Sequence, residues 1–232
     1  MISQTSRSAE NLGSRSLSRA TKKEKKETRM DLTSEYEAKT ARVIVTFNCE
    51  RNCVYCCNKY GRIMSQATRI SNVSSLRGFN TICVTGGEPL LSPEKTLSII
   101  RDIREVCVGA PVYLYTARFI ENMSEILDAV DGMHFTLHDS TTANEVDDFN
   151  RLQDMLRGRT GSYRLYISPS ITLPVTVVPN LWKRVEVKPW MSEQQLLDLQ
   201  PGGLPVGESV FILEPTEKRG SHGVVSRSWR SG

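Results

Sequence analysis

The chain has 232 residues, of which 39% are hydrophobic and 24% are charged, a balance typical of a globular protein. It contains no apolar run near the length of a transmembrane helix and no apolar segment of a secretory signal, so we expect a cytoplasmic protein without membrane contact. In such a reducing compartment, we expect the six cysteines to be buried, catalytic or metal-bound rather than paired in disulfides.

The net charge of +4 comes from the two ends of the chain. Residues 1–30 contain eight Lys or Arg against three Glu, and residues 217–232 contain four against one, whereas the middle is acidic. We therefore predict a basic, disordered tail at 1–38, a folded domain at 39–213 and a flexible basic tail at 214–232. The acidic middle argues against nucleic acid as the main partner.

Apolar, β-branched strands alternate with helix-length segments after the first tail. Strands are predicted at 42–47, 80–85, 112–116, 133–138, 163–168 and 184–188. Helices are predicted at 93–106, 122–129, 144–156 and 193–199, with a weaker helix at 66–76. A strand followed by a helix, about six times over, indicates an α/β fold with parallel strands, either an open doubly wound sheet or a barrel.

Alternation along the later strands places ionisable groups on one face. If Val185 and Val187 contact outer helices, their neighbours point to the opposite side. Ionisable side chains cannot fill a dry core without partners, so they favour the wet interior of an incomplete barrel. Edge strands that face solvent are the alternative. The residues on these inner faces are Arg184, Glu186 and Lys188, then His134, Thr136 and His138, then Arg164, Tyr166 and Ser168. We interpret His134 as a core histidine with satisfied hydrogen bonds.

Three cysteines follow the first predicted strand with the spacing Cys-x3-Cys-x2-Cys. They are Cys49, Cys53 and Cys56, and a loop of this length can wrap an iron–sulfur cluster, which requires thiolate ligands. Zinc is the rival, but a closed structural zinc site takes four ligands, and Cys57 directly after Cys56 is poorly placed as the fourth. Three ligands to a four-iron cube leave one iron open to react.

A glycine-rich turn lies at the end of the second predicted strand, where α/β folds place ligand sites. Gly86 and Gly87 allow a ligand to approach the backbone closely, and Pro89 fixes the exit of the turn. Glu88 can accept a charge-assisted hydrogen bond from an ammonium group. A purely structural strand-to-helix loop would have the same sequence.

Together these two motifs resemble the radical S-adenosylmethionine (radical SAM) superfamily. The resemblance rests on the cysteine spacing, on Tyr55 before the last cysteine and on Gly-Gly-Glu-Pro about thirty residues later, and it extends over roughly 41–190. It implies a partial (β/α)6 barrel with parallel strands. It also implies a [4Fe–4S] cluster on Cys49, Cys53 and Cys56, with S-adenosylmethionine as the second cofactor.

The resemblance further implies contacts to the cofactor and the substrate. In this superfamily the aromatic residue lies beside the adenine, and the glycine-rich motif holds the methionine amino group. Weaker similarities extend to the ends of later strands, and inner-face charges suggest a polar substrate pocket. The implied cofactor contacts are Tyr55, Gly86, Gly87, Glu88, Pro89, Thr116, His138 and Ser168, and the pocket residues are Arg164, Glu186 and Lys188.

The implied reaction is reductive cleavage of S-adenosylmethionine to methionine and a 5′-deoxyadenosyl radical, which abstracts hydrogen from an unidentified substrate. The electron would come from flavodoxin or a similar reductase. The remaining cysteines form no second group, so we expect a small single-cluster member. Small branches include activases of a partner protein and 7-carboxy-7-deazaguanine synthases. The alternative is a non-catalytic, metal-stabilised α/β module that binds nucleic acid through its basic ends.

Overall fold

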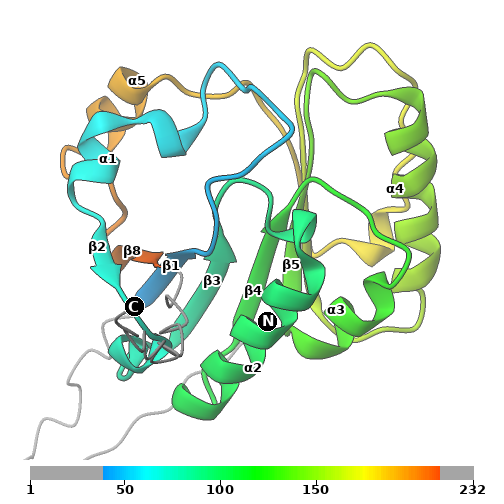
Figure 1. Ribbon diagram of the computed structural model, residues 1–232. Coiled ribbons are helices and arrows are strands. Elements are labelled where there is room, and N and C mark those ends of the chain that lie inside the picture. The colour runs from blue at the N-terminus through cyan, green and yellow to red at the C-terminus, as the bar shows by residue number, and fades with distance from the viewer. Residues whose placement is uncertain (1–38, 215–232) are drawn as a thin grey trace, which may run out of the picture. The chain divides into compact units, whose positions relative to one another are not determined.

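Eight short strands pair side by side in one parallel sheet, and most of them carry apolar residues at alternate positions. The computed structural model describes residues 39–214, so both predicted tails lie outside the described part apart from Glu214. The strand order is β2-β8-β1-β3-β4-β5-β6-β7 (Figure 1). The strands are β1 Thr40–Ile44, β2 Thr68–Ile70, β3 Thr81–Thr85, β4 Val112–Thr116, β5 Gly132–Leu137, β6 Ser162–Ile167, β7 Arg184–Val187 and β8 Glu208–Leu213.

Five helices connect these strands. They are α1 Gly61–Ser65, α2 Pro93–Val106, α3 Met123–Ala129, α4 Ala143–Leu156 and α5 Glu193–Leu199. Figure 1 places α2, α3 and α4 outside the central strands, while α1 and α5 lie together on the side of the molecule that carries β2 and β8. The predicted α/β class with parallel strands is therefore confirmed, and the sheet is an open partial barrel rather than a closed one. In the described segment, no helix combines the length and apolar character that crossing a bilayer requires.

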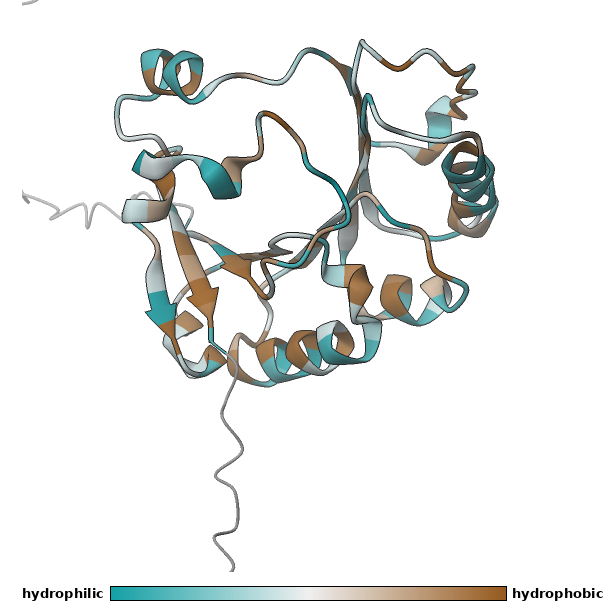
Figure 2. Cartoon of the chain, turned by 45° about the horizontal axis from the view of Figure 1, so that its top comes forward, coloured by the Kyte–Doolittle hydropathy of each residue, from teal (hydrophilic) through white to brown (hydrophobic). Residues whose placement is uncertain are grey.

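The outer face of the sheet and the apolar sides of the helices form the core. Val84, Leu114 and Phe135 on neighbouring strands are almost completely buried, and so are Ile100 and Ile103 of α2. The helices carry their apolar residues toward the sheet and their polar residues outward (Figure 2). Burying each such side chain contributes about 1.5–3 kcal/mol, so this layer fixes the helices against the strands.

The helix predicted at 66–76 is wrong. The segment forms β2 and a 3-10 turn at Val73–Leu76 instead. Ile70, Val73 and Leu76 are all buried, and their spacing of three residues imitates one face of a helix. The short strand is stabilised by pairing with β8, which the sequence did not predict either.

The condition that Val185 and Val187 contact outer helices is not met, and β7 is an edge strand, as in the alternative interpretation. The side chains of Val185 and Val187 are 39% and 61% exposed. β7 is the last strand of the sheet and pairs only with β6 among the described strands. An edge strand of this kind can leave apolar side chains in solvent, because no neighbouring element needs to pack on it.

Gln153 attaches α4 to the long loop between β6 and β7. Its side chain is buried, with Oε1 accepting from the backbone N–H of Val178 at 2.8 Å and from Nε1 of Trp182 at 3.2 Å. Its Nε2 donates to the carbonyl of Thr176 at 2.9 Å. A buried amide with three protein partners is expected to hold this loop in place.

We predict that Gln153→Ala lowers the free energy of unfolding by about 1–3 kcal/mol, because it leaves the buried indole N–H of Trp182 and two partly buried backbone groups without partners. Asn150→Ala is the matched control, since Asn150 lies exposed on the same helix. Urea denaturation of both variants measures the difference. Equal stability of the two variants would show that Gln153 does not hold the loop.

Candidate active site

The three motif cysteines lie in the loop that follows β1, and all three line one cavity. Cys49 is exposed, Cys53 and Cys56 are partly buried, and none is in a disulfide. The cavity has a volume of about 490 Å³ and lies at the carboxyl ends of the strands, between the cysteine loop and the inner face of the sheet. Gly86, Gly87 and Glu88 line the same cavity, so the two sequence motifs face one space.

The donor set of the cavity consists of cysteine thiols. Within residues 39–214, no three His, Cys, Asp or Glu side chains are placed to hold one metal ion. In a [4Fe–4S] cube each cysteine binds a different iron, so its three sulfurs are spread farther apart than the ligands of one ion. Four free thiols line this cavity, those of the three motif cysteines and that of Cys57, and thiolates are the ligands that an iron–sulfur cluster requires.

Backbone hydrogen bonds join the cysteine loop to the glycine-rich turn. The N–H of Gly87 donates to the carbonyl of Thr46 at 2.7 Å, and the N–H of Glu88 donates to the carbonyl of Asn48 at 2.8 Å. A Cβ on Gly87 would overlap the carbonyl oxygen of Asn48, and a Cβ on Gly86 would overlap that of Thr46. Gly86 also has a φ of +147°. These two positions therefore require glycine for a structural reason.

Two side chains that follow Cys57, those of Asn58 and Lys59, hold the carboxyl-terminal end of the cysteine loop. The amide Nδ2 of Asn58 donates to the carbonyl of Gly86 at 2.7 Å. The ammonium group of Lys59 donates to Oδ1 of Asn52 at 2.7 Å and to the carbonyl of Cys53 at 3.1 Å. The loop is thus closed on itself and on the glycine-rich turn. Sequence reasoning missed Asn58 and Lys59.

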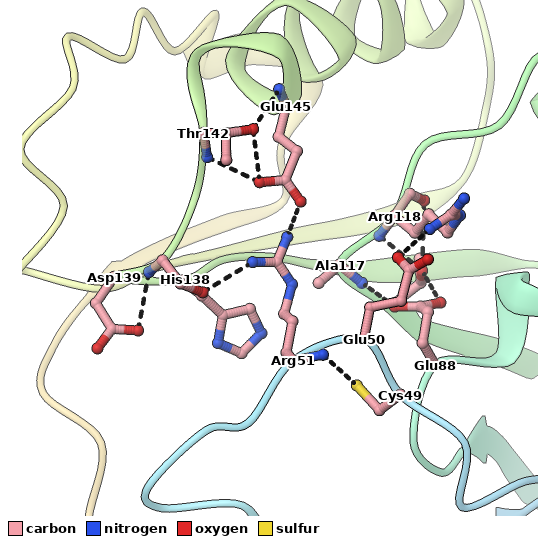
Figure 3. A network of polar contacts seen from close by, with 12 residues as sticks. Cys49, Glu50, Arg51, Glu88, Ala117, Arg118, His138, Asp139, Thr142 and Glu145 are labelled. Atoms are coloured by element: carbon pink, nitrogen blue, oxygen red, sulfur yellow. Dashed lines mark hydrogen bonds and ion pairs between the residues drawn. The ribbon is translucent and has the colours of Figure 1, made fainter.

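Two ion pairs tie the acidic and basic residues after Cys49 to neighbouring elements (Figure 3). Glu50 pairs with Arg118, just beyond β4. Arg51 pairs with Glu145 in the first turn of α4, and its Nη1 donates to Oγ of Ser140 at 3.1 Å. Sequence reasoning missed all of these residues, although opposite charges next to a cysteine were a visible signal.

Glu145 has a second role at the start of α4. It forms a capping box with Thr142, in which each side chain bonds the other residue's backbone N–H. One carboxylate oxygen accepts from Thr142 while the other faces Arg51. The cysteine loop is therefore attached to a helix end that is itself fixed.

Glu88 is bound by the protein itself. Its Oε1 accepts from the hydroxyl of Thr116 at 2.6 Å and from the N–H of Leu90 at 3.0 Å, and its Oε2 accepts from the N–H of Ala117 at 2.9 Å. Burial raises the pKa of this carboxyl, and the three donors oppose that shift. The structure thus places Glu88 and Thr116 together, and the Glu88 carboxylate already has protein donors where an ammonium contact was expected.

His138 lies beside the cysteine loop. Its Nδ1 is 3.5 Å from Sγ of Cys53, and its ring stacks on Trp190 with centroids 5.3 Å apart and planes 10° apart. Burial and the nearby Arg51 lower the pKa of His138 to about 4, so the ring is neutral at neutral pH. Trp190 also contacts Tyr166 at 4.6 Å between centroids. Sequence reasoning missed Trp190, which lies at the end of the segment, roughly 41–190, over which the family resemblance extends.

The thiols of the loop differ in acidity. A hydrogen bond from Cys57 lowers the pKa of Cys56 to about 6, whereas burial raises the pKa of Cys53. The hydrogen bond to Cys56 raises the pKa of Cys57. Cys56 is thus prepared as a thiolate, the form that binds iron.

The remaining expected cofactor contacts are Tyr55, Pro89 and Ser168, and of these only Tyr55 lines the cavity. Tyr55 lines the cavity with 46% of its surface exposed, so its ring is free to contact a ligand. Pro89 is buried at the start of a 3-10 turn, and its carbonyl accepts from Thr96 at 2.7 Å. Ser168 is buried at the end of β6 and does not line the cavity.

The three expected pocket residues do not line one pocket. Arg164 faces a smaller chamber of about 230 Å³ nearer the start of the strands. Glu186 instead accepts from Lys188 at 2.6 Å and from Arg184 at 2.8 Å, which lowers the pKa of Glu186. The interpretation of His134 as a satisfied core residue is wrong, because its Nδ1 is buried without a partner among the described residues.

We predict that Gly87→Ala displaces the cysteine loop, because the added methyl group meets the Asn48 carbonyl. Overpacking of this kind costs about 1–3 kcal/mol, and we expect iron bound after anaerobic reconstitution to fall well below the wild-type level. Gly61→Ala is the control, since nothing lies within 4 Å of its added Cβ. Equal iron content in both variants would contradict the prediction.

Comparison with known proteins agrees with this geometry. The family model described as the Radical SAM superfamily matches residues 43–168, more than half of the 232-residue chain. No curated protein matches the chain. The matched segment begins in β1, contains the cysteine loop and the glycine-rich turn, and ends just after β6. The chain therefore belongs to the radical SAM superfamily, whose members are enzymes that use a [4Fe–4S] cluster and S-adenosylmethionine.

Proposed function

We propose that this chain binds a [4Fe–4S] cluster through Cys49, Cys53 and Cys56 and cleaves S-adenosylmethionine reductively. The observation that carries the proposal is that these three free thiols and the Gly86–Glu88 turn line one cavity of about 490 Å³. When bound, the cluster and S-adenosylmethionine supply methionine and a 5′-deoxyadenosyl radical that abstracts hydrogen from a substrate.

The residues around the cavity position these groups. Tyr55 presents an exposed ring for the adenine, and the turn at Gly86 and Gly87 offers close backbone approach. Glu88 acts through its bonds to Thr116 and Ala117, which fix the turn to the end of β4. A rigid turn costs little reorganisation when a ligand binds.

The aromatic wall of His138 and Trp190 closes one side of the cavity. Both rings line it, and their stacking removes apolar surface from water. Shielding from water is what a reactive radical requires. The neutral His138 adds no charge to this wall, because its pKa lies at about 4.

The partners and the substrate are part of the proposal. Reduction requires an electron donor, and a flavodoxin or similar reductase matches that need. The substrate remains either a partner protein, as for activases, or a small molecule, as for 7-carboxy-7-deazaguanine synthases. The alternative is a non-catalytic, metal-stabilised α/β module that binds nucleic acid, and the family match over residues 43–168 favours the enzyme over it.

The test is anaerobic reconstitution of the full chain with iron and sulfide, followed by reduction with S-adenosylmethionine present. We expect wild type to form 5′-deoxyadenosine, measured by chromatography, and Cys53→Ala to lose both bound iron and product. A wild-type protein that binds iron and S-adenosylmethionine without forming 5′-deoxyadenosine under reduction would contradict the proposal.

Two further cysteine variants make the assignment specific. Cys57→Ser is expected to retain iron, because Cys57 directly follows Cys56 and is poorly placed to share a metal site with it. Cys107→Ser is the matched control, since this buried thiol contacts only the carbonyl of Leu76 among its described hydrogen-bond partners, at 3.3 Å. Loss of iron in Cys57→Ser would transfer a ligand role to Cys57 and overturn the three-cysteine assignment.

A further inference from the structure

A second chamber lies within the partial barrel, beneath the cysteine cavity. Its volume is about 230 Å³, and it is lined by inward-facing residues of six strands, including Thr40, Thr81 and Ser162 at the starts of β1, β3 and β6. Tyr115 lines both this chamber and the larger cavity. The two spaces are therefore neighbours that share the Tyr115 side chain.

One charged pair in the chamber is already neutralised. Arg42 of β1 and Glu208 of β8 form two hydrogen bonds, Nε to Oε2 at 2.5 Å and Nη2 to Oε1 at 3.1 Å. The guanidinium of Arg42 also lies 5.4 Å from the centroid of the Tyr115 ring. This bidentate pair contributes no net charge to the chamber.

Arg164 is different, because its charge is not compensated. It lines the chamber from β6 while remaining exposed to solvent, and no carboxylate within residues 39–214 lies within ion-pair distance of it. Glu186, on the adjacent strand, already pairs with Arg184 and Lys188. The chamber therefore carries one net positive charge on a group with hydrogen-bond donors to spare.

His134 lies directly beside Arg164 and also lacks a partner. The two residues are in register on β5 and β6, and both line the chamber. Nδ1 of His134 is buried without a hydrogen-bond partner among the described residues, which is unfavourable when no ligand or water satisfies it. Burial and the charge of Arg164 lower the pKa of His134 to about 4, so the ring is neutral at neutral pH and can donate one hydrogen bond.

These features select a ligand chemistry. A guanidinium fork matches the two oxygens of a carboxylate, and one positive charge balances one carboxylate better than a phosphate dianion. The rings of Tyr113 and Tyr115 provide flat apolar walls for the rest of the molecule.

We propose that this chamber is a subsite for a carboxylate of the substrate, held by Arg164 and by Nδ1 of His134. The inference rests on the proposed function only in calling the ligand a substrate, because none of the three motif cysteines lines the chamber. It specifies the substrate class as an acid whose carboxylate binds in the chamber while another part reaches past Tyr115 to the cysteine cavity.

The test compares benzoate with benzamide, which share a ring but differ in charge. The full reconstituted chain is titrated with each compound by isothermal titration calorimetry. Wild type is expected to bind benzoate about tenfold more tightly than benzamide, and Arg164→Gln is expected to lose that preference. Arg184→Gln is the control, since Arg184 is in register with Arg164 but is already paired with Glu186.

A second measurement needs no variant. Phenylglyoxal modifies arginine, and peptide mass spectrometry measures its rate at Arg164 in the wild-type chain. Benzoate is expected to slow this modification, whereas benzamide is not. The proposal is overturned if wild type binds both compounds equally or neither, if Arg164→Gln keeps the preference, or if benzoate leaves the labelling rate unchanged.

These outcomes are independent of the radical reaction. Formation of 5′-deoxyadenosine by the wild-type chain is assayed in parallel without either compound. If 5′-deoxyadenosine forms but the chain does not bind benzoate more tightly than benzamide, the carboxylate subsite fails and the proposed function stands. If the preference holds but no 5′-deoxyadenosine forms, the chamber stands and the proposed function fails.

Discussion

The contact between the cysteine loop and the glycine-rich turn positions the rest of the candidate site. Two backbone hydrogen bonds, from Gly87 to Thr46 and from Glu88 to Asn48, hold two chain segments together at the ends of adjacent strands. Their close approach is possible only without a Cβ at the glycines. Because the turn cannot move without the loop, the three thiols and the turn face the same cavity.

Side chains extend this contact into the sheet and the helices. Glu88 connects the turn to β4 through Thr116, while Arg51 connects the loop to the start of α4 through Glu145. Arg51 keeps only 14% of its side-chain surface exposed, so its ion pair is screened less by solvent than a surface pair. Beneath this network, the barrel interior changes from thiols and glycines to the charged chamber around Arg164. The barrel interior thus contains two chemically different cavities, and the Tyr115 side chain lines both.

Much of the fold was predictable because alternating apolar residues and helix caps are local signals, and the six strands predicted from them are all present. β2 was missed because its three residues, Thr68–Ile70, carry no periodicity. The pairing of β8 with β1 and β2 was not predictable because it joins segments that are distant in the sequence. In the candidate site, motif spacing predicted which residues share the cavity. It could not predict that Glu88 would be bound by Thr116, or that Trp190 would stack on His138, because those contacts depend on the folded positions of distant segments.

The account depends on an iron–sulfur cube whose open iron faces the Gly86–Glu88 turn. Electron paramagnetic resonance of the reconstituted, dithionite-reduced protein, recorded before and after S-adenosylmethionine is added, tests this most directly. The account predicts a signal of a reduced [4Fe–4S] cluster whose g values shift when the cofactor is added, because the cofactor binds the open iron. A protein without such a signal, or with a spectrum that the cofactor leaves unchanged, would contradict it.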